Sequence, residues 1–166
     1  MPRKTAAMSS PVPPSVFLPD DCATTRLGRL LARLLRAGDV VLLEGGIGAG
    51  KTHLARAFIQ HKLGKMEDVP SPTFTLVQTY EADGYDIWHA DLYRLSHPDE
   101  VMELGLEAAF DTAVCLIEWP DRLGNLTPDN ALRISLSPHD DGRVAVISGG
   151  RTGLADALKA SWVSDA

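Results

Sequence analysis

A glycine-rich segment between a strand-like and a helix-like stretch constrains the fold of this chain more than any other feature. Residues 45–52 read G-G-I-G-A-G-K-T and match the phosphate-binding pattern G-x-x-x-x-G-K-[S/T]. Residues 40–43 are a short apolar run, typical of a buried strand, and residues 53–63 have the spacing of an amphipathic helix. Strand, loop and helix N-terminus together concentrate unpaired N–H groups and the helix dipole on one anion. The sequence therefore predicts a nucleoside triphosphate site.

Each position of this loop has an expected role. The glycines can adopt φ > 0 and allow backbone N–H groups to approach the phosphates closely. We expect Lys51 to reach the β- and γ-phosphates and the Thr52 hydroxyl to bind Mg²⁺. The residues predicted to contact the nucleotide are Gly45, Gly46, Ile47, Gly48, Ala49, Gly50, Lys51 and Thr52.

Length and composition indicate one globular domain without a membrane span. The chain has 166 residues, of which 45% are hydrophobic, and no apolar run is longer than a strand. Residues 15–166 are predicted to form the domain, and the proline-rich residues 1–14 a disordered tail. There is no signal-peptide pattern, and the two cysteines lack the spacing of a metal site, so we expect a cytoplasmic location. A net charge of −6 argues against tight, unassisted binding to nucleic acid.

The order of predicted elements indicates an α/β fold of the P-loop NTPase type, a three-layer sandwich with a mixed, centrally parallel sheet. Strands and helices alternate early in the chain, and hairpins follow late. The predicted strands cover residues 15–18, 40–44, 74–80, 86–91, 113–117, 131–137 and 143–148, and the predicted helices 24–36, 51–63, 98–110 and 152–163.

The first predicted helix has two contrasting faces. Its leucines recur at helical spacing on one face, and Gly38 is expected to end the helix. The opposite face is basic, and it is either a solvated surface or a docking stripe for an acidic protein or RNA. The arginines of this face are Arg26, Arg29, Arg33 and Arg36.

Nucleotide hydrolysis also requires acids that hold the metal ion and position water. Glu118 directly follows four apolar residues of a predicted strand, and Asp91 ends another, so both are candidate catalytic residues and metal ligands. Each can also be an ordinary charge at a strand end. Thr73 follows a proline and lies between the predicted helix at 51–63 and the next predicted strand, where nucleotide-sensing loops commonly lie.

Two other classes of protein share this phosphate loop. A small-molecule kinase needs a lid of arginines, but the later arginines are scattered. A regulatory GTPase needs an Asn-Lys-x-Asp guanine reader, which the sequence lacks. Adenine is therefore the expected base, although only because the guanine signal is missing.

Four motifs in order make the chain resemble one family. G-G-I-G-A-G-K-T, S-P-T-F-T-L-V, H-A-D-L-Y-R-L and I-E-W-P are similar to the motifs of the TsaE (YjeE) family, over about residues 24–138. The resemblance implies a cytoplasmic, Mg²⁺-dependent ATPase of tRNA threonylcarbamoyladenosine biosynthesis. It also implies the proteins TsaD and TsaB as partners, with tRNA reached indirectly through their complex. In that family ATP hydrolysis is thought to reset the transferase between turnovers.

The resemblance also implies roles for single residues. Lys51 and Thr52 would hold phosphate and Mg²⁺, and Thr73 would be the switch threonine. Asp91 and Glu118 would be the acids at metal and water, without a decision on which binds Mg²⁺ directly. Trp119 would pack near the nucleotide or in the core, and Arg94 would face a partner, pair with a switch acid or form a buried ion pair. The chain departs from the family pattern at Gly46, where aspartate is common, and after about residue 138.

Overall fold

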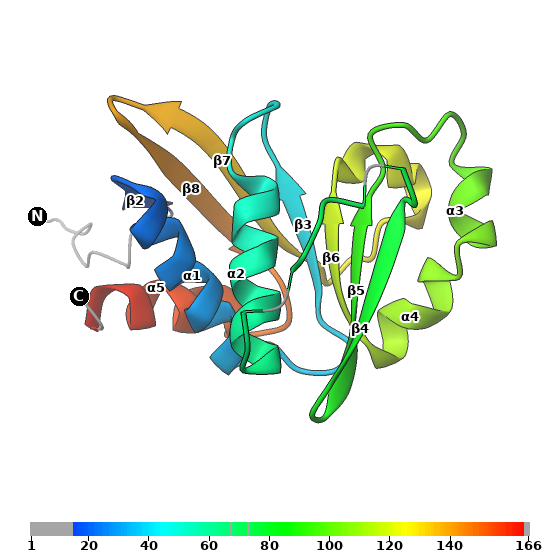
Figure 1. Cartoon of the computed structure of the whole chain (residues 1–166), viewed down its shortest axis with the longest axis horizontal. Helices are drawn as coiled ribbons and strands as arrows, with labels where there is room; N and C mark the ends of the chain where they lie inside the picture. Colours follow the sequence, from blue (N-terminus) through cyan, green and yellow to red (C-terminus); the bar gives the residue numbers. More distant parts are fainter. Residues whose placement is uncertain (1–14, 67, 73, 165–166) are drawn as a thin grey trace, which may run out of the picture.

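Two central strands of the sheet are apolar up to a final glutamate, because the sheet is covered on both faces (Figure 1). The computed structural model describes residues 15–66, 68–72 and 74–164. In these ranges the sheet has the order β2-β8-β7-β3-β6-β5-β4, with β7, β3, β6 and β5 parallel and the outer pairs antiparallel. This confirms the mixed, centrally parallel sheet. The strands are β2 (Ser15–Leu18), β3 (Val40–Glu44), β4 (Val77–Ala82), β5 (Tyr85–Asp91), β6 (Val114–Glu118), β7 (Leu132–His139) and β8 (Gly142–Gly149).

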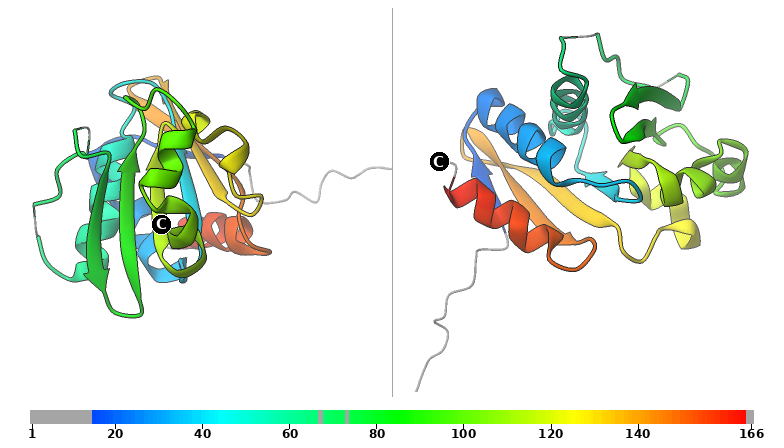
Figure 2. Two further views of the ribbon diagram at one scale, coloured as in Figure 1. Left: turned by 90° about the vertical axis from the view of Figure 1, so that its right-hand side faces the viewer. Right: turned by 90° about the horizontal axis from the view of Figure 1, so that it is seen from below.

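Alternate residues of β3 enter two separate cores. Val41 and Leu43 pack in the core that contains residues of helices α1 (Asp21–Leu34), α2 (Lys51–Leu63) and α5 (Leu154–Ser164). Val40 and Leu42 pack in the core of α3 (Asp99–Glu103), α4 (Leu106–Thr112) and the 3-10 segment η1 (Pro120–Leu126). Figure 2 shows the helices on either side of the strands. The three-layer sandwich is therefore confirmed.

Helix α1 begins earlier and ends earlier than predicted. The side chain of Asp20 caps it, accepting from the Ala23 N–H at 2.9 Å, and the helix ends before Leu35, whose backbone is extended. The prediction that Gly38 ends the helix is wrong. Gly38 has φ +95° and lies in the turn before β3, where its N–H donates to the Ala113 carbonyl at 2.9 Å. An aspartate cap before the apolar pattern set the start of α1.

Two other predicted elements are interrupted. The helix expected at 98–110 is split into α3 and α4 by Gly105, whose φ is +80°. The strand expected from residue 74 begins at Val77, because Leu76 has φ +67° and its N–H closes a turn on the Pro72 carbonyl at 2.7 Å. Local backbone turns therefore override the apolar spacing in both places.

The C-terminal helix is present as predicted and is fastened to α1. The Arg26 guanidinium lies 3.9 Å from the ring centroid of Trp162 and donates to the Trp162 carbonyl. Among the described residues, no helix is long and apolar enough to cross a membrane. The predicted tail at 1–14 lies outside the described ranges.

Candidate nucleotide-binding site

The glycine loop connects β3 to α2 at the carboxyl end of the parallel strands, where ligands bind in open α/β sheets. Two of its glycines are required by the backbone. Gly45 has φ +148°, and a Cβ there would lie 2.6 Å from the Leu136 carbonyl oxygen. Gly50 precedes α2 with φ 104°, in the left-handed region. The loop therefore presents the free N-terminus of a 13-residue helix.

The Lys51 side chain folds back over the loop. Its Nζ donates to the carbonyl of Gly45 and, at 3.4 Å, to that of Gly46, and it lies 3.6 Å from the ring centroid of Trp119. Burial lowers the pKa of Lys51 below its usual 10.5, against the nearby carboxylates of Glu118, Asp91 and Asp121, which raise it. Three carboxylates thus favour the charged form of Lys51 at the start of α2.

Glu118 and Thr52 form a polar contact between the end of β6 and the start of α2. The Thr52 hydroxyl donates to the two carboxylate oxygens of Glu118 at 2.9 and 3.1 Å. Glu118 ends β6 and is aligned with Leu43 of β3, which brings an acid 66 residues away to the start of α2. The parallel register of two buried strands therefore fixes the carboxylate beside the hydroxyl.

A buried histidine holds Glu118 from the other side. His89 of β5 is fully buried, and its Nε2 lies 2.6 Å from a Glu118 oxygen. A carboxylate only accepts, so Nε2 carries the proton in this pair. The Nδ1 atom has no hydrogen-bond partner among the described residues. Sequence reasoning missed the pairing of His89 with Glu118, although His89 begins the H-A-D-L-Y-R-L motif.

Asp91 occupies the equivalent place at the end of β5, aligned with Glu118 across the parallel ladder. One of its oxygens accepts from the Tyr93 N–H at 3.0 Å, and the other from the Ser71 hydroxyl at 3.5 Å. Asp91 therefore fastens the segment before residue 73 to the sheet. Thr73 itself lies outside the described residues.

Trp119 has an unusual backbone for a large residue. Its φ and ψ are 57° and 54°, a left-handed conformation that costs about 1–2 kcal/mol outside glycine. The ring meets Tyr93 at 4.8 Å between centroids and covers Lys51, so it borders the loop instead of the core. Arg94 is exposed and its guanidinium lies 5.1 Å from the Phe74 ring centroid, so the expectation of a buried ion pair is wrong.

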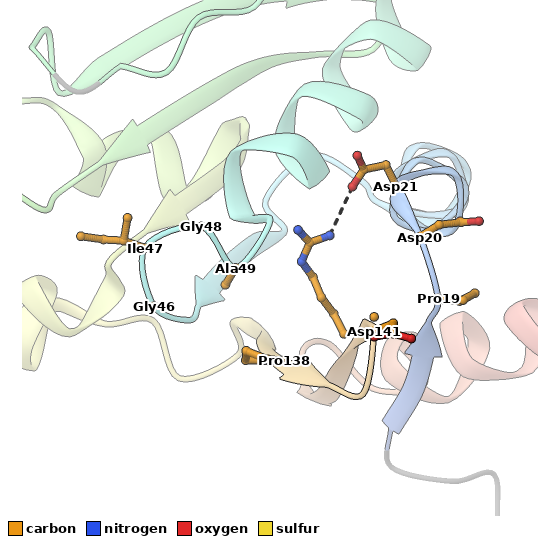
Figure 3. A pocket seen from close by; sticks show the side chains of 11 residues that line it. Pro19, Asp20, Asp21, Gly46, Ile47, Gly48, Ala49, Pro138 and Asp141 are labelled. Atoms are coloured by element: carbon orange, nitrogen blue, oxygen red, sulfur yellow. Dashed lines mark hydrogen bonds and ion pairs between the residues drawn. The ribbon is translucent and has the colours of Figure 1, made fainter.

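A pocket of about 520 Å³ opens on the other side of the loop (Figure 3). Residues Gly46 to Ala49 line one wall, and the β7–β8 hairpin and the start of α1 line the others. Arg143 of the hairpin reaches across it, 3.3 Å from Asp21 and against Gly50 of the loop. Sequence reasoning missed this pair, because 122 residues separate its members and neither lies in a motif.

The donor set at the loop fits Mg²⁺ held in part by a nucleotide. A hydroxyl and a carboxylate converge at Thr52 and Glu118, and Mg²⁺ is commonly bound by one or two carboxylates together with phosphates and water. In the described ranges, no group of three or more His, Cys, Asp or Glu side chains could hold a metal alone.

Comparisons with known proteins agree on one family. The family model described as threonylcarbamoyl adenosine biosynthesis protein TsaE matches residues 18–145. The tRNA threonylcarbamoyladenosine biosynthesis protein TsaE of Rickettsia felis is 37% identical over 88% of this chain and 87% of its own length. That of Haemophilus influenzae is 36% identical over 76% and 84%. The crystal structure of Bacillus subtilis YdiB superposes with a TM-score of 0.73 at 27% identity, covering 92% of this chain and 95% of that one.

Proposed function

The chain belongs to the TsaE family of tRNA threonylcarbamoyladenosine biosynthesis, and on this premise we propose that it is a slow, Mg²⁺-dependent ATPase. Its nucleotide state would regulate or reset the TsaD–TsaB transferase complex. We place it in the cytoplasm, with tRNA contacted through that complex. Family membership supports the assignment to this pathway, and the geometry of the site supports the proposed reaction.

The contact between Thr52 and Glu118, beside Lys51, is the observation that supports hydrolysis most strongly. Lys51 supplies a positive charge for the phosphates, and the loop N–H groups supply fixed dipoles. Thr52 and Glu118 would hold Mg²⁺, which when bound would supply positive charge against the phosphates. Glu118 would share that ion with Thr52 or accept a hydrogen bond from the attacking water. His89 would keep the carboxylate in place for either role.

The pocket beside the loop supports a site for the base and ribose. A pocket of about 520 Å³ lies within the range of small-molecule sites, and it adjoins the loop on the β7 side. Arg143 borders this pocket and the loop glycine Gly50. We therefore assign Arg143 a role in nucleotide affinity, on the flank opposite to Glu118.

The position of Arg143 also supports slow ATP turnover by the isolated chain. Phosphoryl transfer is fast when an arginine neutralises the transition state on the γ-phosphate. β6 with Glu118 adjoins one side of β3, whereas the hairpin with Arg143 follows from β7 on the other side. Arg143 is paired with Asp21 there, so it is poorly placed to act at the acidic side. A partner would have to supply or reposition the missing group.

Exposed apolar side chains near the site support control by a partner. Ile47 in the loop and Phe74 after the switch position are 82% and 85% exposed.

A small-molecule kinase is less well supported as the function, because the later arginines bind at separate places in the fold and do not form one lid. Arg122 donates to Leu95, Arg133 pairs with Glu44 and Arg151 with Asp39.

The proposal is tested by measuring ATP hydrolysis with and without purified TsaD and TsaB from the same genome. We expect slow release of phosphate from the isolated protein with MgATP, loss of that activity in EDTA, and a clear increase when both partners are added. Fast hydrolysis that the partners leave unchanged would contradict the proposal. Hydrolysis in proportion to an added small metabolite would instead indicate a kinase.

A further inference from the structure

A groove between α1 and α2 is lined by basic side chains, although the chain as a whole is acidic. The groove has a volume of about 600 Å³, and its wall includes three cations in a protein of net charge −6. They are Arg29 of α1, Arg56 of α2 and Lys65 just after it, accompanied by His53 and His61. Among the described residues that line it there is no carboxylate. The groove is therefore a local positive site.

The groove changes the interpretation of the arginine face of α1. Arg26 does not belong to a continuous stripe, because it packs on Trp162 of α5. Arg29 is exposed and lines the groove, where α2 and Lys65 just after it supply the remaining basic groups. The positive surface thus lies across two helices that are distant in sequence.

The groove adjoins the nucleotide site through the first turn of α2 and through one hydrogen bond to residue 69. His53 follows Thr52 directly, and its Nε2 lies 3.0 Å from the Thr25 hydroxyl of α1. The Arg56 Nε donates to the Val69 carbonyl at 3.1 Å, in the segment that Ser71 fastens to Asp91. A ligand in the groove would contact the outer side of the helix whose first turn binds the nucleotide.

We propose that this groove docks an acidic segment of the protein partner, with its carboxylates on Arg29 and Arg56. An apolar side chain of the same segment would pack on Met66, which is 85% exposed, and on Ala57. RNA fits less well, because its affinity grows with the number of phosphates neutralised. The basic groups here are confined to one groove and would neutralise only a few phosphates. The inference rests on the proposed partnership with TsaD and TsaB.

The test is a binding titration of wild-type protein and variants against the purified TsaD–TsaB pair, with ATP present. In Arg29→Glu/Arg56→Glu the dissociation constant should rise about tenfold or more, and the wild-type affinity should fall with added salt. Arg29→Glu alone keeps the Arg56 contact to Val69 and should show about half of the effect on a logarithmic scale. The matched control, Arg33→Glu/Arg36→Glu, makes the same change of charge outside the groove, at the last turn of α1 and just after it. Circular dichroism and ATP affinity check that each variant is folded.

The outcomes separate this inference from the proposed function. Wild-type binding that the groove variants weaken and the control leaves within about twofold supports the groove as the docking site. Equal binding by all variants, or equal loss in groove and control variants, overturns the groove while the partnership stands. If the wild-type protein does not bind the pair, the proposed function fails and this inference falls with it. A loss confined to binding of a tRNA transcript would assign the groove to RNA instead.

Discussion

The two flanks of the phosphate loop are built in different ways. The acidic flank, made of His89, Asp91 and Glu118, is almost completely buried at the ends of parallel strands, with Glu118 2% exposed. The hairpin flank, made of Arg143 and Asp21, is more open to solvent, with the Arg143 side chain 28% exposed and that of Asp21 75% exposed. Buried groups with fixed partners suit chemistry, whereas an exposed ion pair can adapt to a ligand. We therefore expect substitutions on the two flanks to affect different kinetic constants.

Glu118→Gln should have the largest effect. It keeps the shape and most hydrogen bonds of the side chain but removes the charge that faces Thr52, Lys51 and His89. We expect partner-stimulated kcat to fall about a thousandfold with ATP binding retained, measured by phosphate release and by equilibrium titration. Loss of ATP binding together with loss of folding would show that Glu118 is structural.

Lys51→Ala should act mainly on affinity for the triphosphate. It removes the cation that lies over the loop at the centre of the acidic surroundings. We expect ATP to bind about a hundredfold more weakly, measured by titration with a fluorescent ATP analogue. The control is Lys62→Ala, on the far turn of the same helix. Unchanged affinity in Lys51→Ala would remove the basis for the phosphate-loop assignment.

His89→Ala should lower kcat by about tenfold through the displaced Glu118, without a matching change in ATP affinity. It should also reduce the free energy of unfolding by about 1–3 kcal/mol, because a buried partner of the carboxylate is lost. His89→Gln restores an N–H donor and should recover part of kcat. If both variants lose only stability and keep kcat, His89 does not position the catalytic carboxylate.

Arg143→Ala should have the smallest effect, and it sharpens the comparison most. On the hairpin flank we expect KM for ATP to rise about fivefold while kcat stays within twofold, because an exposed contact is worth about 1 kcal/mol. Arg33→Ala, at the far end of α1, is the control. A large fall in kcat would instead show that Arg143 reaches the acidic side of the loop.

The difference between the acidic flank and the hairpin flank also explains how much of the site could be predicted from the sequence. The residues of the acidic flank lie in short sequence motifs, in which an apolar strand ends in an acid. The order of four such motifs along the chain identifies the family. Strand pairing then placed Asp91 opposite Glu118 without further information. On the hairpin flank, Arg143 meets Asp21 only because β8 returns beside β2, and no periodicity reveals that contact.

Errors in the predicted elements have similar causes. The expected start of α1 at residue 24 ignored the cap at Asp20, and the expected end at Gly38 took a glycine of the turn before β3 for the helix terminus. The strand expected from residue 74 ignored the turn that Leu76 closes on Pro72. Single hydrogen bonds decide such boundaries, whereas the hydrophobic pattern fixes only the element and its buried face.

The most direct test of the central claim counts rounds of tRNA modification by TsaD and TsaB in the presence of this protein. With wild-type protein and MgATP, we expect several threonylcarbamoyladenosine products for each transferase complex. With Glu118→Gln, which should bind ATP without hydrolysing it, we expect a first round and then arrest. Equal numbers of rounds with both proteins would contradict the account, because ATP hydrolysis at this loop would then not reset the complex.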